Sequence, residues 1–128
     1  MGAIPIGSGG RVLLARRGIE PFYGDWNTIG GFLEYNEDPL EGLTREVKEE
    51  TGVGCIIKDF ICINSDIYGS DGKALLNTYY TVQLLSDDVH PLDDVSELKW
   101  FSLDELPKNI AFESDRRALV ALKKQIHE

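Results

Sequence analysis

Three glutamates in the middle of the chain are spaced so that they can act together on a cation. Glu46, Glu49 and Glu50 stand at positions i, i+3 and i+4, and a helix places such residues beside one another. Like charges held so close repel, which predicts a positively charged partner. Mg²⁺ and similar hard cations bind carboxylate oxygens and often share their remaining positions with phosphate oxygens. The spacing therefore indicates a divalent-cation site for a phosphorylated ligand, whereas the plain alternative is a solvated acidic helix face.

The helix that must position these glutamates is predicted over residues 38–51. Asp38 can cap its N-terminus, Pro39 suits the first helical position, and Gly52 is a signal for the C-terminal end. Gly42, inside the helix, costs roughly 1 kcal/mol relative to alanine, which is explained if the helix backbone lies close against a sheet. The expected buried stripe of this helix consists of Leu40, Leu43 and Val47.

Composition describes an acidic domain with one core. The chain has 128 residues, 42% of them hydrophobic, and we expect a single domain over residues 1–128. Its formal net charge of −9 argues against a nucleic-acid polymer or an anionic membrane surface as a partner. No apolar run approaches the roughly 20 residues of a membrane span, and the first residues lack the features of a signal peptide. Cys55 and Cys62 are expected to be buried thiols in a reducing, cytoplasmic environment.

The rest of the chain alternates strands with helices. Five apolar runs predict strands, and the first is expected at a sheet edge because it contains Pro5. A turn is predicted at 69–72, a capped helical turn at 102–105, and a terminal helix over 114–126 with Ile126 on its buried side. This order is typical of an α/β or α+β sandwich. The expected strands cover residues 3–6, 11–17, 55–64, 78–85 and 97–101.

Residues 31–53, GFLEYNEDPLEGLTREVKEETGV, match a known motif. With U for an aliphatic residue, the motif reads Gly-x5-Glu-x7-Arg-Glu-U-x-Glu-Glu-x-Gly-U, and every specified position is filled. Similarity continues outside it, in LLARR at 13–17, in the segment at 24–31 and in the segment at 98–107. On these residues the chain resembles the Nudix hydrolase family over nearly its whole length. The matching positions are Gly31, Glu37, Arg45, Glu46, Val47, Glu49, Glu50, Gly52 and Val53.

The resemblance implies a fold and a reaction. Nudix domains are α/β/α sandwiches around a mixed β-sheet, and the motif forms a loop, a helix and a second loop. They hydrolyse the diphosphate linkage of a nucleoside diphosphate joined to another moiety, such as a nucleotide sugar, a dinucleotide or a (d)NTP, usually with Mg²⁺ or Mn²⁺. The expected partner is therefore a small nucleotide diphosphate, and homodimers are common among the relatives.

The resemblance also assigns roles to the acidic residues. Glu46, Glu49 and Glu50 are expected to bind the metal, with the Gly30 carbonyl as a further ligand. Metals lower the pKa of a bound water and stabilise the charge that develops on the leaving oxygen, and a carboxylate then accepts the proton of the water. The candidates for that general base are Glu49, Glu50 and Glu97, the last because it follows the acidic loop at 86–96.

Other residues are expected to orient the site or contact the substrate. Arg45 can pair with Glu37, which would hold the loop before the helix to the helix itself. The arginines in the strand at 11–17 lie beside the expected cleft, and strand alternation turns only one of them inward. Aromatic side chains can stack on a base, although they are more often part of the core. The substrate-contact candidates are Arg16, Arg17, Phe22 and Tyr68.

The substrate itself stays open at this level. The run that marks NADH pyrophosphatases, the proline typical of ADP-ribose pyrophosphatases and the coenzyme A signature are all missing. A nucleotide-sensing Nudix domain without turnover is the main alternative, and a plain acidic interaction domain is another. The complete set of motif carboxylates favours the metal-dependent hydrolase.

Overall fold

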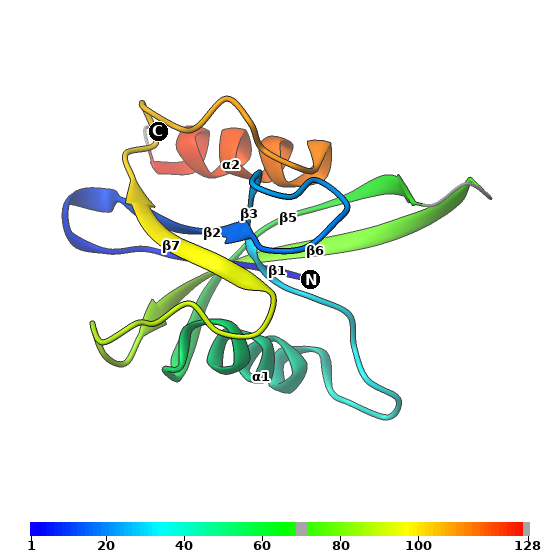
Figure 1. The fold of residues 1–128 in the computed structure, drawn as a ribbon, viewed down its shortest axis with the longest axis horizontal. Coiled ribbons are helices and arrows are strands. Elements are labelled where there is room, and N and C mark those ends of the chain that lie inside the picture. Colours follow the sequence, from blue (N-terminus) through cyan, green and yellow to red (C-terminus); the bar gives the residue numbers. More distant parts are fainter. Residues whose placement is uncertain (69–71, 127–128) are drawn as a thin grey trace.

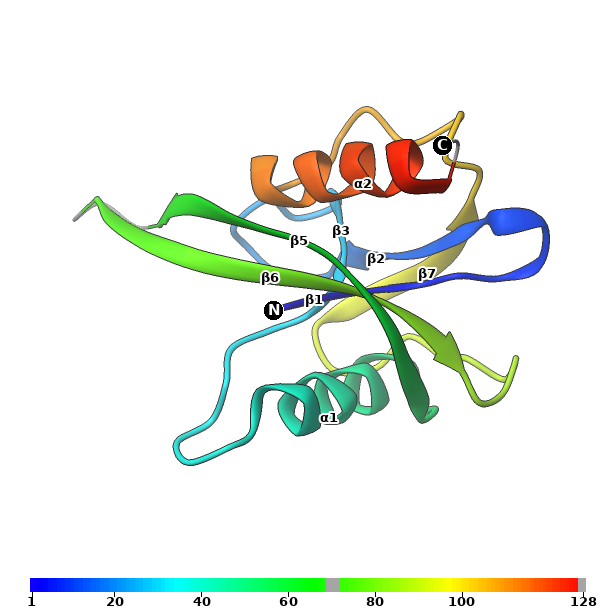
Figure 2. The ribbon, with the colours of Figure 1, turned by 180° about the vertical axis from the view of Figure 1, so that it is seen from behind.

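The computed structural model describes residues 1–68 and 72–126, with only the backbone described at positions 67 and 68. The strands form a central layer that α1 covers on one side and α2 on the other (Figures 1 and 2). This arrangement is the expected α/β/α sandwich. The elements are β1 Gly2–Pro5, the short 3-10 helix η1 Ser8–Gly10, β2 Val12–Arg17, β3 Trp26–Asn27, β4 Ile29–Gly30, α1 Pro39–Thr51, β5 Cys55–Tyr68, β6 Lys73–Leu84, β7 Val95–Phe101 and α2 Glu113–Ile126.

The strand layer consists of two sheets. The first has the order β4-β1-β6-β5 and is mixed, because β1 runs parallel to β6 and antiparallel to β4. The second has the order β3-β2-β7 and is antiparallel. Both β5 and β6 extend beyond their predicted ends into a long hairpin, and the turn predicted at 69–72 lies largely outside the described residues.

The first strand is an interior strand, so the prediction of an edge strand is wrong. The backbone N–H of Ile6 donates to the Val82 carbonyl at 3.1 Å, and alternation along the strand turns the nitrogen of Pro5 away from β6. On that other side β4 pairs only with Gly2 and Ala3. Pro5 is therefore tolerated inside the sheet because no partner strand reaches its nitrogen.

Burial on both faces of the strand layer explains the apolar run in β2. Val12 and Leu14 pack into the cluster on the α2 side, and Leu13 and Ala15 pack into the cluster on the α1 side. All four are fully buried. A strand covered on both faces has no solvent-facing positions, which is why the sequence here does not alternate.

The predicted limits of the central helix are confirmed. The Asp38 side chain accepts hydrogen bonds from the backbone N–H groups of Leu40 and Glu41, at 3.0 and 3.5 Å. Gly52 ends the helix in the left-handed conformation, with φ of 81°, and its N–H donates to Lys48. Local capping signals thus set both ends of α1.

Two expectations about the faces of α1 are wrong. Leu40 is 44% exposed, so the buried face of the helix starts with Leu43. A Cβ on Gly42 would stand 2.7 Å from a carboxylate oxygen of Glu37 and 2.9 Å from Leu33. The glycine therefore makes room for the loop that precedes the helix, and close approach to a sheet is not its explanation.

The remaining elements differ from expectation in details. Ile126 is 48% exposed and lies off the buried side of α2, which Leu119 and Leu122 form. Residues 102–105 form a turn capped by the Ser102 hydroxyl, not a helical turn. Both cysteines are free; Cys55 is buried and Cys62 half-buried. Neither helix in the described residues combines the length and the apolar composition that crossing a membrane requires.

Candidate active site

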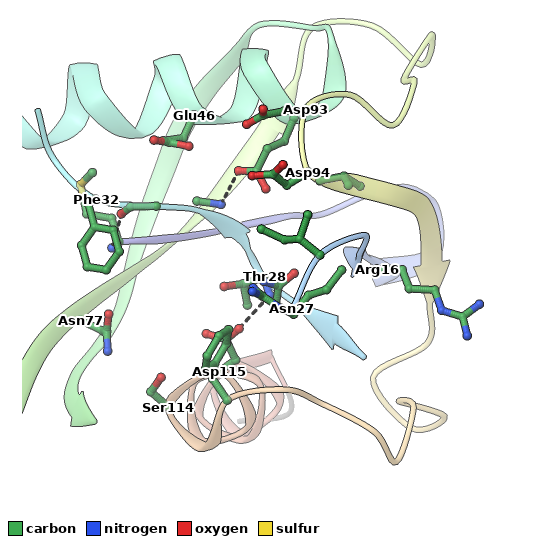
Figure 3. Close-up of a pocket in the computed structure, with 18 of the residues that line it drawn as sticks. Arg16, Asn27, Thr28, Phe32, Glu46, Asn77, Asp93, Asp94, Ser114 and Asp115 are labelled. Atoms are coloured by element: carbon green, nitrogen blue, oxygen red, sulfur yellow. Dashed lines mark hydrogen bonds between the residues drawn. The ribbon is translucent and has the colours of Figure 1, made fainter. Parts of the chain in front are cut away.

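A cavity of about 320 Å³ opens between the layer of α1 and the layer of α2 (Figure 3). Met1 at the N-terminus and Gly30 and Gly31 at the end of β4 are among the lining residues. The wall toward α1 carries four acidic residues, and the wall toward α2 carries polar groups, one aspartate and one aromatic ring. The acidic wall contains Glu46, Glu50, Asp93 and Asp94, and the opposite wall contains Thr28, Asn77, Phe112, Ser114 and Asp115.

The three glutamates of α1 do not all face this cavity. Glu46 and Glu50, one helical turn apart, line it. The Glu49 side chain is 46% exposed and accepts two hydrogen bonds from Arg45 Nη1, each at 3.2 Å. The structure therefore brings together two of the predicted metal ligands and sets the third beside an arginine at the rim.

Arg45 ties the loop before α1 to the helix. Its Nε and Nη2 donate to the two carboxylate oxygens of Glu37, at 2.6 and 2.9 Å. Its Nη1 donates to Glu46 at 3.0 Å, and Nη2 also donates to the Phe32 carbonyl at 3.3 Å. The paired guanidinium lowers the pKa of Glu37 to about 2 and raises the pKa of Arg45. The pair expected from the sequence is thus present and joins loop to helix.

Burial and neighbouring negative charges disfavour ionisation of the Glu50 carboxylate. Burial raises its pKa to about 8, and the charges of Glu46, Asp93 and Glu49 add to the effect. The backbone N–H of Gly30 donates to Glu50 Oε2 at 2.9 Å and opposes the shift. One hydrogen bond does not offset this much desolvation and repulsion, so the site favours added positive charge.

Two glycines allow the backbone to lie against these carboxylates. Gly30 has a φ of 151°, and a Cβ there would collide with the Met1 carbonyl oxygen. A Cβ on Gly31 would stand 2.8 Å from the carboxylate of Glu46. Only glycine at both positions permits this approach. Coordination of a metal by the Gly30 carbonyl stays a prediction, because the contact seen here is made by its N–H.

The carboxylate oxygens of the acidic wall are suitable ligands for a hard divalent cation, although these carboxylates are not grouped around one point. Within residues 1–68 and 72–126, no three Asp, Glu, His or Cys side chains are grouped so as to hold a metal ion. Arg45 donates hydrogen bonds to the carboxylates of Glu46 and Glu49. The oxygen donors nevertheless match the preference of Mg²⁺ or Mn²⁺, and the raised pKa of Glu50 marks a negative field that a cation would relieve.

Glu97 and Arg16 pair with each other away from this cluster. They are register partners on β7 and β2, and Arg16 Nη1 lies 3.3 Å from Glu97 Oε1. Arg16 contributes to the cavity wall, but its guanidinium points away from the acidic residues (Figure 3) and its Nε donates to the Gly24 carbonyl at 2.9 Å. The Glu97 carboxylate is thus 46% exposed and lies outside the cavity lining.

The other substrate-contact candidates lie in different surroundings. Arg17 lines the cavity, with its guanidinium 5.2 Å from the centre of the Phe112 ring. Phe22 is 48% exposed, meets Phe112 edge-on at 5.6 Å and is not among the residues that line the cavity. The side chain of Tyr68 lies outside the described residues. Both neighbouring arginines contribute to the cavity lining, so the expectation that alternation turns only one of them inward is wrong. A β-bulge between Arg16 and Arg17 interrupts the alternation of the strand.

Sequence reasoning did not single out the residues of the far wall. Asp115 accepts hydrogen bonds from the Thr28 N–H at 2.9 Å and from the Tyr79 hydroxyl at 2.6 Å, and burial raises its pKa. The Ser114 hydroxyl oxygen lies 2.9 Å from the same Tyr79 hydroxyl, within hydrogen-bond distance. No local sequence pattern indicates this network, because the residues that pair in it are 35 or more positions apart in the chain. The acidic loop was visible in the sequence, but nothing there distinguished Asp93 within it.

Without divalent cations, we expect the free energy of unfolding to fall as pH rises from about 5 to about 8. The pKa of Glu50 is about 8 in the folded protein, against an ordinary value of 4.5, so folding favours the protonated form. The corresponding stability is present at low pH and is lost as Glu50 ionises, on the order of 3 kcal/mol. Glu37 ionises below this range, because its pKa is lowered.

Urea unfolding with EDTA across that pH range measures this slope. The Glu50→Gln variant should show a clearly flatter dependence, and Glu41→Gln, in the exposed first turn of the same helix, should match the unmodified protein. Equal slopes in all three proteins would contradict the assignment of the raised pKa to Glu50.

Comparison with known proteins identifies the class to which this fold and site belong. The family model of the NUDIX domain matches residues 1–122, and the chain therefore belongs to the Nudix family. A MutT Nudix hydrolase from Burkholderia pseudomallei has a similar structure, with a TM-score of 0.83, 28% identity and 94% of each chain covered.

Two curated relatives are similar in sequence but longer. An ADP-ribose pyrophosphatase from Methanocaldococcus jannaschii is 29% identical over 83% of this chain and 62% of its own length. The NAD-capped RNA hydrolase NudC from Pseudomonas aeruginosa is 32% identical over 89% of this chain and 40% of its own length. The chain thus spans less than two thirds of either relative.

Proposed function

We propose that this protein hydrolyses the diphosphate linkage of a small nucleoside diphosphate derivative, with Mg²⁺ or Mn²⁺. The observation that carries the proposal is the acidic wall of the cavity, where Glu46 and Glu50 of the Nudix helix lie against Gly30 and Gly31 at the end of β4. The names of the relatives support the reaction class, since they include a pyrophosphatase and a hydrolase of NAD-capped RNA.

The charged residues of α1 have different tasks in this proposal. Glu46 and Glu50 hold the cation, which when bound neutralises phosphate charge and makes water a better nucleophile. Glu50 is also the favoured general base among the three candidates, because Glu49 and Glu97 lie outside the cavity lining and are each paired with an arginine. Arg45 positions Glu46 and the preceding loop and is not itself in the cavity.

The opposite wall can receive the organic part of the substrate. Phe112 offers an aromatic face, with the Arg17 guanidinium close to its ring. Asn77 and Ser114 supply hydrogen-bonding groups beside it. The cavity volume of about 320 Å³ falls at the lower end of the range for small-molecule sites. A polyanion at the acidic wall and a base or sugar at the far wall would together occupy this space.

Product analysis tests the proposed function. The protein is incubated with ADP-ribose, NADH, diadenosine polyphosphates, nucleotide sugars or (d)NTPs, each with Mg²⁺ and with excess EDTA. We expect cleavage of at least one class with Mg²⁺ and loss of that cleavage in EDTA. Saturable binding of a ligand without any cleavage would overturn the hydrolase in favour of a nucleotide sensor.

A further inference from the structure

We propose that Asn77 determines which organic group the cavity accepts, by pairing its side-chain amide with a planar ring that presents a hydrogen-bond donor and an acceptor side by side. The inference rests on the proposed function, because it concerns the substrate of the same cavity. Asn77 lies on β6 and lines the wall toward α2, together with Ser114 and Asp115 (Figure 3). The edges of nucleobases and the carboxamide of a nicotinamide ring both have this pattern.

The other polar side chains of this wall are already engaged within the protein. Asp115 accepts from the Tyr79 hydroxyl at 2.6 Å and from the Thr28 N–H at 2.9 Å, and it also hydrogen-bonds the Thr28 side chain. The Ser114 hydroxyl lies 2.9 Å from the Tyr79 hydroxyl. All four residues are at most 7% exposed. Their hydrogen bonds hold the wall in place and leave them little capacity for a ligand.

The amide of Asn77 is not engaged in this way. Among residues 1–68 and 72–126 it has no hydrogen-bond partner, and the side chain is half-buried in the cavity lining. An asparagine amide offers two N–H donors and a carbonyl acceptor. The same group pairs with adenine through two hydrogen bonds in protein–DNA complexes, and such a pair discriminates against the wrong base. The Asn77 amide is therefore suited to a ring edge that supplies an acceptor and a donor together.

Strand pairing fixes Asn77 at this place. Its register partner on β5 is Asn64, whose Nδ2 donates to the Ser114 carbonyl at 3.2 Å. Asn64 Oδ1 is buried and accepts no hydrogen bond from the described part of the chain. Opposite residues of an antiparallel pair have Cβ atoms about 5 Å apart, so this acceptor lies close to the unused amide. The competing interpretation is that Asn77 acts within the protein, by donating to Asn64.

The surroundings favour a planar ring over a sugar as the group that Asn77 contacts. Phe32 and Phe112 both line the cavity, and aromatic side chains bind planar rings by stacking. A sugar presents several hydroxyl groups and needs several hydrogen-bonding side chains. Within the described residues, Asn77 is the one polar side chain of this wall without a partner inside the protein.

Binding of nucleoside monophosphates tests the inference, because these compounds lack the diphosphate linkage and are not cleaved. Dissociation constants are measured by isothermal titration calorimetry with Mg²⁺ for AMP, GMP, CMP, UMP and nicotinamide mononucleotide. Ribose 5-phosphate is the probe without a base. At least one nucleotide should bind about tenfold or more tightly than ribose 5-phosphate, and its identity shows whether a nucleobase or a carboxamide is recognised. An unmodified protein with no such preference would overturn the inference.

Two variants of Asn77 separate recognition of the ring from a general effect on the site. Asn77→Leu has a similar size and no hydrogen-bonding group, so it should lower the preference over ribose 5-phosphate about tenfold. Its affinity for ribose 5-phosphate should change by less than about twofold. Asn77→Asp keeps the shape but loses the donors, and its added charge acts on the phosphate of both compounds, so the preference should also fall. Thr78→Val, at the next position of β6 and outside the cavity lining, is the control.

The outcomes distinguish this inference from the proposed function. An unchanged preference in Asn77→Leu would overturn the assignment. An equal loss of affinity for the nucleotide and for ribose 5-phosphate would show that Asn77 acts within the protein, through Asn64, and would overturn it as well. A preference that depends on Asn77, in a protein that cleaves none of the diphosphate compounds, would overturn the hydrolase and support the assignment of Asn77.

Discussion

Replacing Glu50 with glutamine is expected to lower kcat about a thousand-fold or more, equivalent to roughly 4 kcal/mol of transition-state stabilisation. The reason is that Glu50 combines two tasks at one position. It is a cavity-facing carboxylate for the cation and the best-placed acceptor for the proton of the attacking water. Glutamine has the same shape but neither the charge nor the basicity.

The fold of the Glu50→Gln variant should remain intact. A glutamine oxygen can still accept the hydrogen bond that the Gly30 N–H makes to Glu50 at 2.9 Å. The substitution also removes a carboxylate that burial and neighbouring charges disfavour, so the metal-free variant should be at least as stable at pH 8. Steady-state kinetics and urea unfolding on the same preparation check both parts.

Glu41→Gln is the matched control, because Glu41 is exposed in the first turn of α1 and away from the cavity. It should leave kcat unchanged. A Glu50→Gln variant with the kcat of the unmodified protein would remove this helix from the mechanism.

Replacing Arg45 with lysine is the second substitution with a large expected effect, about a tenfold to hundredfold loss in kcat. The guanidinium spans both oxygens of Glu37, then reaches Glu46, Glu49 and a backbone carbonyl. Lysine keeps the charge but is a single point donor, and it cannot bridge the loop and the helix at once. The carboxylate of Glu46 then loses its fixed position, so we expect a larger loss in kcat than the unchanged net charge would predict.

Two readouts identify Arg45 as a positioning residue. The Arg45→Lys variant should bind Mn²⁺ more weakly and show a lower kcat at saturating metal, because the glutamates must be reordered for each binding event. Its Tm should also fall, since Glu37 no longer holds the loop. Arg11→Lys, on an exposed arginine whose Nε donates to the Ser8 carbonyl, is the control. Activity of Arg45→Lys equal to that of the control would show that charge alone suffices.

The helix at the centre of the site could be predicted closely, and the reason is physical. Its limits depend on Asp38 and Gly52, whose contacts are made within four residues along the chain. The same holds for the pairing of Arg45 with Glu37, eight positions apart. Interactions this local are encoded in spacing, so periodicity and capping rules reach them.

Contacts between distant segments could not be predicted in this way. Whether β1 lies at the edge or in the interior of its sheet depends on which strands pair with it. One of these strands is β6, whose paired residues come more than 70 positions later in the chain. The far wall depends equally on Asp115 meeting Tyr79 and Thr28 across three elements. Spacing along the chain carries no information on such pairs, because each residue type has many possible partners.

The sequence by itself determined the family, the helix and the acidic character of the site. The tertiary structure decided which acids share the cavity. On α1 the tertiary structure places Glu46 and Glu50 in the cavity lining and leaves Glu49 outside it, because the cavity wall covers only part of the acidic face of the helix. Beyond α1 it draws Glu97 to Arg16 through strand register and brings Asp93 inward through hydrogen bonds to the helix end. Local spacing defines which side chains can cooperate, and only long-range packing selects those that meet.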